Sequence, residues 1–150
     1  MSLESEDKDK SVGEEEVKVE FGGECLKINS VTLNSEISIL MLNKLIRKSD
    51  GIIMIMDSAD QNAISANCEW VNYLLKQLSG TEIPLLLLAN KIDKSQAYGE
   101  HELRQQFKIS EFSEQKHIIS DVKFEVFMSS VIKRHGYGEA IRWILSHILH

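Results

Sequence analysis

Residues 84–93 read PLLLLANKID, an unbroken apolar run that ends in a polar tetrapeptide. A short and continuously apolar run is typical of a strand that is covered on both faces of a parallel sheet. A second run of this kind, Gly51 to Met56, is bounded by Asp50 and Asp57. Between the two runs, residues 61–78 place their apolar side chains on one helical face, so a helix is predicted to join two parallel strands.

The rest of the chain extends this order of elements. Alternation over Val17 to Phe21 and Cys25 to Leu33, with Gly22-Gly23 between them, predicts a half-buried antiparallel hairpin. Helical spacing predicts further helices at Ile37 to Ile46, around Leu103 and Phe107 with Ile109 just beyond, and from Ile141 to Ile148, and alternation predicts a strand at 122–128. From residue 51 the order is β-α-β-α-β-α, which predicts an α/β fold with a mostly parallel sheet.

Charge and cysteine usage narrow the class of protein. Seven acidic residues and two lysines lie in residues 1–16, which we expect to be a disordered acidic tail before a single domain at 17–150. The remainder is almost neutral, which argues against a nucleic-acid-binding surface.

Cys25 and Cys68 lie in apolar-patterned segments and are predicted to be two buried free thiols. The five histidines share no spacing with carboxylates or cysteines, so no metal site and no catalytic residue are predicted.

Three loops follow the predicted parallel strands, and ligands of α/β sheets bind at that edge. The loop at Asn90, Lys91 and Asp93 has a specific chemical meaning, because one carboxylate can accept from both the N1–H and the exocyclic amine of guanine. Asn90 can bridge to the base and to the neighbouring loop, and the stem of Lys91 can lie along the ring. The alternative is an ordinary polar turn before the next helix.

The other two loops begin at Asp57 and at Ser129. A backbone N–H after the last strand, that of Met128 or Ser129, would donate to the guanine O6, although Ser129 and Ser130 also suit a plain loop. Asp57 and Ser58 are interpreted as a strand end and helix N-cap, with Asp60 as an alternative cap.

Several of these segments together resemble the Arf and Arf-like small GTPases. GIIMIMDSAD (51–60) is similar to the family's fourth strand, ANKID (89–93) to its fourth guanine-nucleotide motif, and residues 129–133 with GEAIRWI (138–144) to its fifth motif and closing helix. VEFGGECLKI (19–28) resembles the hairpin between the two switch regions. The resemblance implies a small-GTPase-like, P-loop NTPase-type three-layer sandwich that binds GTP or GDP and acts through protein partners in membrane traffic or ciliary pathways.

The same resemblance also marks departures. Where the family has D-x-x-G-Q, this chain has Ser30, Leu33 and Asn34 at the Asp, Gly and Gln positions, and no G-x-x-x-x-G-K-[ST] occurs in the 150 residues. Each charge-assisted phosphate contact contributes about 1.5–3 kcal/mol, so we expect weak nucleotide binding, no Mg²⁺ site and no GTP hydrolysis. The nucleotide site would then be the guanine half: Asn90, Lys91, Asp93, Met128 and Ser129. Met128 stands where the family has a small Ala.

Because the phosphate-loop motif does not occur in the 150 residues, we expect the sheet to lack its first strand together with the phosphate loop. Three alternatives stay open. The sheet closes without that strand, a partner supplies a strand, or residues 10–21 have another place in the fold than the one predicted above. Two other hypotheses fit the resemblance: a truncated or splice form of an active GTP-binding Arf-like GTPase, and a signal-recognition-particle-receptor β-like subunit.

Partners and location follow from the remaining features. Partner binding is expected at the remnant switch helix (Ile37 to Ile46). No apolar run approaches the ~20 residues that span a bilayer, the N-terminus lacks a signal-peptide pattern, and position 2 is Ser. We therefore expect a cytoplasmic protein, peripheral at membranes, with no intrinsic membrane anchor.

Overall fold

The computed structural model describes residues 15–107 and 121–149. The chain divides into two compact units, with the boundary between Leu42 and Asn43. The single domain expected at 17–150 stays a prediction.

The first unit contains a β-hairpin of β1 (Glu15–Phe21) and β2 (Glu24–Ser30), which pair antiparallel. Gly22 and Gly23 both have positive φ, +60° and +84°, as the tightest hairpin turns require. The register sets Val17 opposite Ile28, so the apolar side chains of the hairpin share one face. This face is exposed, Val17 by 50%, and so the predicted half-burial is wrong for the hairpin.

Two other expectations fail in the same segment. Strand β1 begins at Glu15, so the tail was predicted two residues too long, and its residues 1–14 lie outside the described residues. Cys25 lies opposite Glu20 and is exposed, while Cys68 is half-buried; both are free thiols. Burial of Cys25 was inferred from alternation, which does not say which face of a ribbon is covered.

Helix α1 (Ile39–Lys48) follows the hairpin and spans the boundary between the units. The Ser38 hydroxyl accepts a hydrogen bond from the Met41 N–H at 3.4 Å, as an N-cap does. Arg47 and Lys48 lie in the last turn, where positive charge is favourable. Leu40 is 77% exposed on this helix.

The second unit is built on a three-stranded parallel sheet in the order β3-β4-β5, with β3 at Ile52–Asp57, β4 at Leu85–Asn90 and β5 at Phe124–Met128. The register aligns Met56 with Ala89 and Ala89 with Met128. The three strands therefore reach the same edge of the sheet, and the loops that follow them start side by side.

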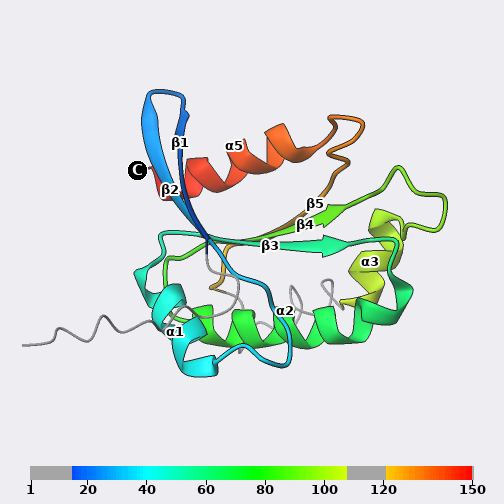
Figure 1. Cartoon of the computed structure of the whole chain (residues 1–150), viewed down its shortest axis with the longest axis horizontal. Coiled ribbons are helices and arrows are strands. Elements are labelled where there is room, and N and C mark those ends of the chain that lie inside the picture. Colours follow the sequence, from blue (N-terminus) through cyan, green and yellow to red (C-terminus); the bar gives the residue numbers. More distant parts are fainter. Residues whose placement is uncertain (1–14, 108–120, 150) are drawn as a thin grey trace, which may run out of the picture. The chain divides into compact units, whose positions relative to one another are not determined.

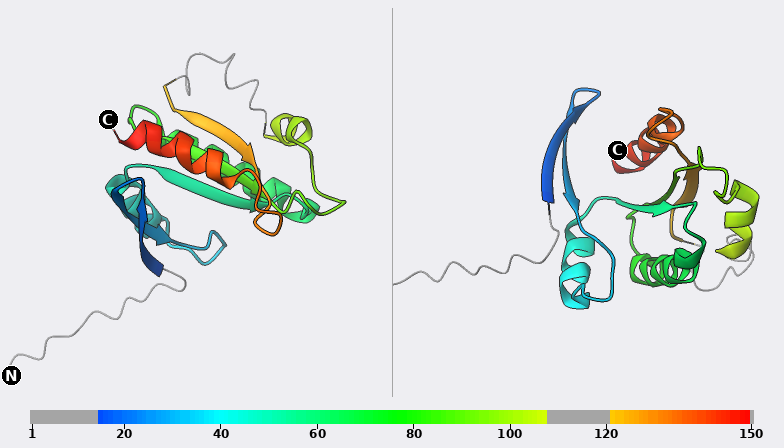
Figure 2. Two further views of the ribbon diagram at one scale, coloured as in Figure 1. Left: turned by 90° about the horizontal axis from the view of Figure 1, so that it is seen from above. Right: turned by 45° about the vertical axis from the view of Figure 1, so that its right-hand side comes forward.

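Helices cover both faces of this sheet. A short 3₁₀ helix η1 (Gln61–Ala63) leads into α2 (Ile64–Leu78), which lies on one face with α3 (Glu100–Gln106), while α5 (Tyr137–Ile148) lies on the other (Figures 1 and 2). The core on the α5 side contains Leu86, Leu88, Ala140 and Ile144. This order confirms the small-GTPase-like three-layer α/β sandwich.

Strands β3 and β4 differ in how they are covered. Leu85 to Ala89 are all buried, as the solid apolar run predicts. In β3 only Met54 and Met56 are buried, while Ile53 and Ile55 are 37% and 64% exposed. Because α5 packs on Leu86 and Leu88 of the central strand, the same face of the outer strand β3 is left open. Coverage of β3 on both faces was therefore a wrong prediction.

Candidate functional site

The loops after β4 and β5 meet at the carboxyl edge of the sheet. The Ile92 N–H donates to the Ser129 carbonyl at 3.2 Å, and the Val131 N–H donates to Asn90 Oδ1 at 3.3 Å. Asn90 thus makes the bridge to the neighbouring loop that its position predicts. The two loops form one hydrogen-bonded cluster with Asp93 at its rim.

Asp93 is held as a hydrogen-bond acceptor. The Ser130 hydroxyl donates to Asp93 Oδ1 at 2.7 Å, and Ser130 is itself buried. This hydrogen bond, the largest of several causes, lowers the pKa of the Asp93 carboxyl below its ordinary value. Asp93 is therefore a carboxylate at neutral pH, the form that two adjacent N–H donors of guanine require.

Ser130 is the residue that positions Asp93, and the sequence did not single it out. Its hydroxyl oxygen also accepts the Lys133 N–H at 3.1 Å, and its backbone pairs with His135 in both directions at 2.9 Å. A serine after a strand has too many ordinary roles for sequence alone to assign this one.

Lys91 lies in the left-handed region, with φ of +63°. Its Nζ contacts Asp57 Oδ2 at 2.8 Å, so the ammonium group joins the loop after β4 to the end of β3. That hydrogen bond is the main cause that lowers the pKa of Asp57 and raises the pKa of Lys91. Asp57 therefore belongs to the site, although the sequence indicated only a strand end or cap.

The cap after β3 is Asp60, the alternative of the two. Its side chain accepts from the Asn62 N–H at 3.2 Å at the start of η1. Ser58 is buried and donates both its N–H, at 2.9 Å, and its hydroxyl to the Asn90 carbonyl. Ser58 thereby joins the loop after β3 to the loop after β4, residues 90–93, which we call the reading loop.

The backbone donor expected for guanine O6 needs a correction. The Ser129 N–H donates to the Ala89 carbonyl at 2.8 Å as part of the parallel pairing, so it is not available to a ligand. The N–H directed at Asn90 is that of Val131, two residues later. Met128 is half-buried at the end of β5, and its carbonyl lies against Gly136. The Ser129 alternative is therefore excluded by the pairing of the sheet, and the Met128 N–H stays a prediction.

The segment matching D-x-x-G-Q has its own local contacts. The Ser30 hydroxyl donates to the Glu15 carbonyl at 3.4 Å, within the hairpin. Asn34 Oδ1 accepts the Glu36 N–H at 2.9 Å and closes a turn before α1. Leu33 between them is half-buried. No side chain from Ser30 to Asn34 offers the carboxylate of the motif, and the Asn34 side-chain oxygen is already engaged.

Two other classes of feature, a metal-binding cluster and a membrane-spanning helix, are absent from the described residues. Within residues 15–107 and 121–149, no three His, Cys, Asp or Glu side chains group as metal ligands would. In the same part of the chain, no helix combines the length and apolar character needed to cross a bilayer.

A parallel sheet between two layers of helices, with an N-K-x-D loop at its carboxyl edge, defines a protein of the small-GTPase class. The chain belongs to the ADP-ribosylation factor family, whose model matches residues 15–148. The small COPII coat GTPase SAR1 of Giardia intestinalis is 29% identical over 117 residues, which cover 75% of this chain and 61% of that protein. ADP-ribosylation factor-like protein 8c of Arabidopsis thaliana is 28% identical over 107 residues, covering 71% of this chain and 54% of that protein. The chain thus spans about half to three fifths of the length of these relatives.

Proposed function

We propose that this Arf-family chain acts by binding protein partners in membrane traffic or ciliary pathways and does not hydrolyse GTP. The observation that carries the proposal is the chemistry of the segment matching D-x-x-G-Q. Ser30 has no carboxylate for a metal-bound water, and the Leu33 side chain stands where a glycine lets a γ-phosphate approach the backbone. Asn34 is shorter than glutamine, and its side-chain oxygen already accepts the Glu36 N–H.

The reading loop supports a residual guanine site in the same protein. Asp93 is a carboxylate held by Ser130, and Asn90 and Lys91 are ordered around it. Met128 and Ser129 line the neighbouring loop start, with Val131 as the amide that faces Asn90. In this proposal GTP and GDP bind weakly and without Mg²⁺, because these 150 residues offer contacts to the base and contain no phosphate-loop motif.

Titration of the chain with labelled GTP and GDP, with and without Mg²⁺, tests the proposal, together with release of phosphate from GTP. Weak binding that ignores Mg²⁺, and no phosphate release, is expected. Magnesium-dependent binding tighter than micromolar, or turnover, contradicts it. Asp93→Ala should remove the preference for guanine over adenine nucleotides, whereas the exposed Asp50→Ala, the same substitution outside the site, should keep it.

A second candidate is favoured by the intact N-K-x-D loop: a truncated or splice form of an active GTP-binding Arf-like GTPase. Asn90, Lys91 and Asp93 would then belong to a complete nucleotide site of full affinity and not to a residual guanine site. Tight binding in the titration above supports this candidate, so one experiment separates the two.

The partner face in this proposal is helix α1, the remnant switch helix. Leu40 and Ile39 are exposed on it, 77% and 46%, and exposed apolar side chains on a helix are suited to a protein interface. The SAR1 relative is named for the COPII coat, which supports a role in membrane traffic at the cytoplasmic face of membranes. Leu40→Glu should abolish capture of partner proteins, while Ile132→Glu, at a 78% exposed loop position, should not.

A further inference from the structure

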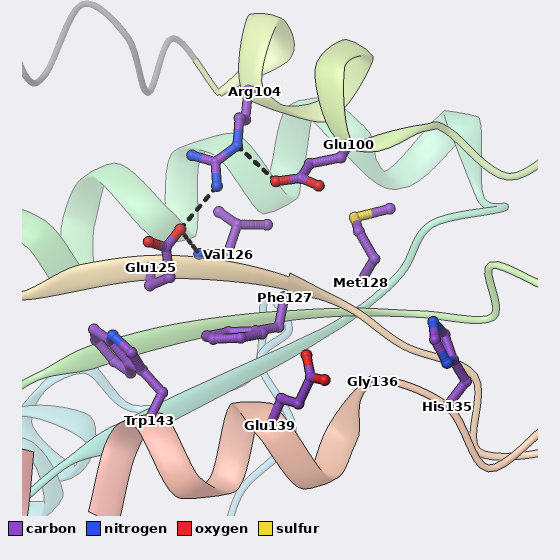
Figure 3. Close-up of a pocket in the computed structure, with 10 residues that line it drawn as sticks. All are labelled: Glu100, Arg104, Glu125, Val126, Phe127, Met128, His135, Gly136, Glu139 and Trp143. Atoms are coloured by element: carbon purple, nitrogen blue, oxygen red, sulfur yellow. Dashed lines mark hydrogen bonds and ion pairs between the residues drawn. The ribbon is translucent and has the colours of Figure 1, made fainter. Parts of the chain in front are cut away.

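A hollow of about 400 Å³ lies on the second unit and extends to Met128 at the end of β5 (Figure 3). Its walls come from α3 and α5, and the outer strand β5 forms its floor. We call it the β5 groove and define it by Glu100, Arg104, Glu125, Phe127, Glu139 and Trp143.

The charges of the β5 groove are unbalanced. Arg104 contacts two of its carboxylates, Glu100 through Nε at 3.1 Å and Glu125 through a terminal nitrogen at 2.8 Å. The hydrogen bond to Glu125 is the main cause that raises the pKa of Arg104. Within the described residues Glu139 has neither an ion pair nor a hydrogen bond, and it is exposed in the groove. The groove therefore has one negative charge with no cation opposite it.

Aromatic rings lie between the carboxylates. Phe127 and Trp143 are half-buried, with ring centroids 6.3 Å apart and planes inclined by 55°. In Figure 3 the Phe127 ring lies between the side chains of Trp143 and Glu139. A cation over such rings gains cation–π attraction, and a planar guanidinium stacks on an indole better than an ammonium does.

One backbone amide at the edge of β5 is already used. The Val126 N–H points away from the sheet and donates to the Glu125 side chain at 2.9 Å. Since Arg104 holds that carboxylate, the outward amide is already used. Backbone pairing of a ligand at Val126 is therefore blocked, which leaves the side chains of the groove for its recognition.

We propose that the β5 groove binds an arginine side chain of a partner protein, with the guanidinium on Trp143 and paired with Glu139. The choice of partner chemistry rests on charge complementarity, because the groove has three carboxylates and one guanidinium of its own. The contact between Arg104 and Glu125 shows that the groove already accommodates a guanidinium. The site goes beyond the proposed function, since Glu139 and Trp143 belong neither to α1 nor to the guanine half-site, although the hollow extends to Met128.

The two tryptophans of the chain provide a site-specific test, because Trp143 lies in the groove and Trp70 lies on α2. The ¹⁵N-labelled chain is titrated with a capped pentapeptide of alternating glycine and arginine while both indole N–H signals are followed. The Trp143 signal should shift with an about millimolar Kd, and the Trp70 signal should not move. The same peptide with citrulline, which is isosteric and neutral, should leave both signals in place.

Two matched variants complete the experiment. Glu139→Gln should weaken the arginine peptide by about threefold or more, and Glu69→Gln, the same change on the exposed face of α2, should not. Both positions are exposed, so each variant should keep the spectrum of the folded chain. The proposal is overturned if the Trp143 signal stays fixed, if citrulline binds equally, or if the two variants behave alike.

Discussion

Among the described glycines, Gly136 is the one at which an added methyl group would meet the nearest atom. It precedes α5 with φ of +82°, and a Cβ placed there would lie 1.9 Å from the Met128 carbonyl oxygen. An L-residue in this backbone conformation costs about 1–2 kcal/mol. Relief of the clash requires a shift of β5 or of the loop that holds Asp93, which adds about 1–3 kcal/mol. Gly136→Ala should therefore lower the free energy of unfolding by about 2–5 kcal/mol.

Two other glycines separate the parts of this loss. Gly80 has a similar φ of +77° with no atom within 4 Å of an added Cβ, so Gly80→Ala should cost only about 1 kcal/mol. At Gly51 an added Cβ would meet Ile148 Cδ1 at 2.7 Å, but this is the flexible end of a side chain. Gly51→Ala should cost about 1 kcal/mol or less.

Urea unfolding followed by far-UV circular dichroism measures all three variants, and thermal melts provide a second readout. For a chain of this size 1 kcal/mol moves Tm by about 2–4 °C, so Gly136→Ala should lower Tm by about two to five times as much as Gly80→Ala does. Equal midpoints for the Gly136 and Gly80 variants would refute the close approach to Met128 and with it the described geometry of the loop.

Three further results are expected. Hydrogen bonds lower the pKa values of Asp57 and Asp93, so the stability these carboxylates contribute should be complete above about pH 4 and lost as pH falls through the lowered values. Replacing both by Asn should reduce the fall in the free energy of unfolding at acid pH, and an unchanged acid dependence would contradict the prediction. A thiol reagent at pH 8 should modify exposed Cys25 faster than Cys68, whose pKa is raised by burial, and equal rates would contradict the exposures. Ile55→Lys should reduce aggregation with little change in unfolding midpoint, since Ile55 is 64% exposed on an outer strand, and sedimentation measures this.

Some elements could be read from the sequence because their signal is local. The apolar run before Asn90 is long, unbroken and bounded by Gly80, so it predicted β4 and its burial on both faces. Helix α2 followed from spacing, and the hairpin turn from Gly22-Gly23. A similar apolar run at β3 predicted burial on both faces wrongly. Burial of a strand depends on which strands of the sheet the helices pack against, and the composition of the strand does not determine this.

The candidate site divides in the same way. Asn90, Lys91 and Asp93 were recognisable because their spacing alone has a chemical meaning. Asp57 and Ser130, which hold two of them, were not, since each contact joins residues more than thirty positions apart.

The PLLLLANKID segment with its neighbours thus determined the fold class, the family and the location of the reading loop. Periodicity and short motifs are local, and local patterns are sufficient for those conclusions. Only the tertiary structure decided that Lys91 is joined to Asp57, that Ser130 holds Asp93, and that the Ser129 amide is used by the sheet. The physical reason is that strand register determines which groups can form hydrogen bonds, and this register brings the ends of β3, β4 and β5 to one edge.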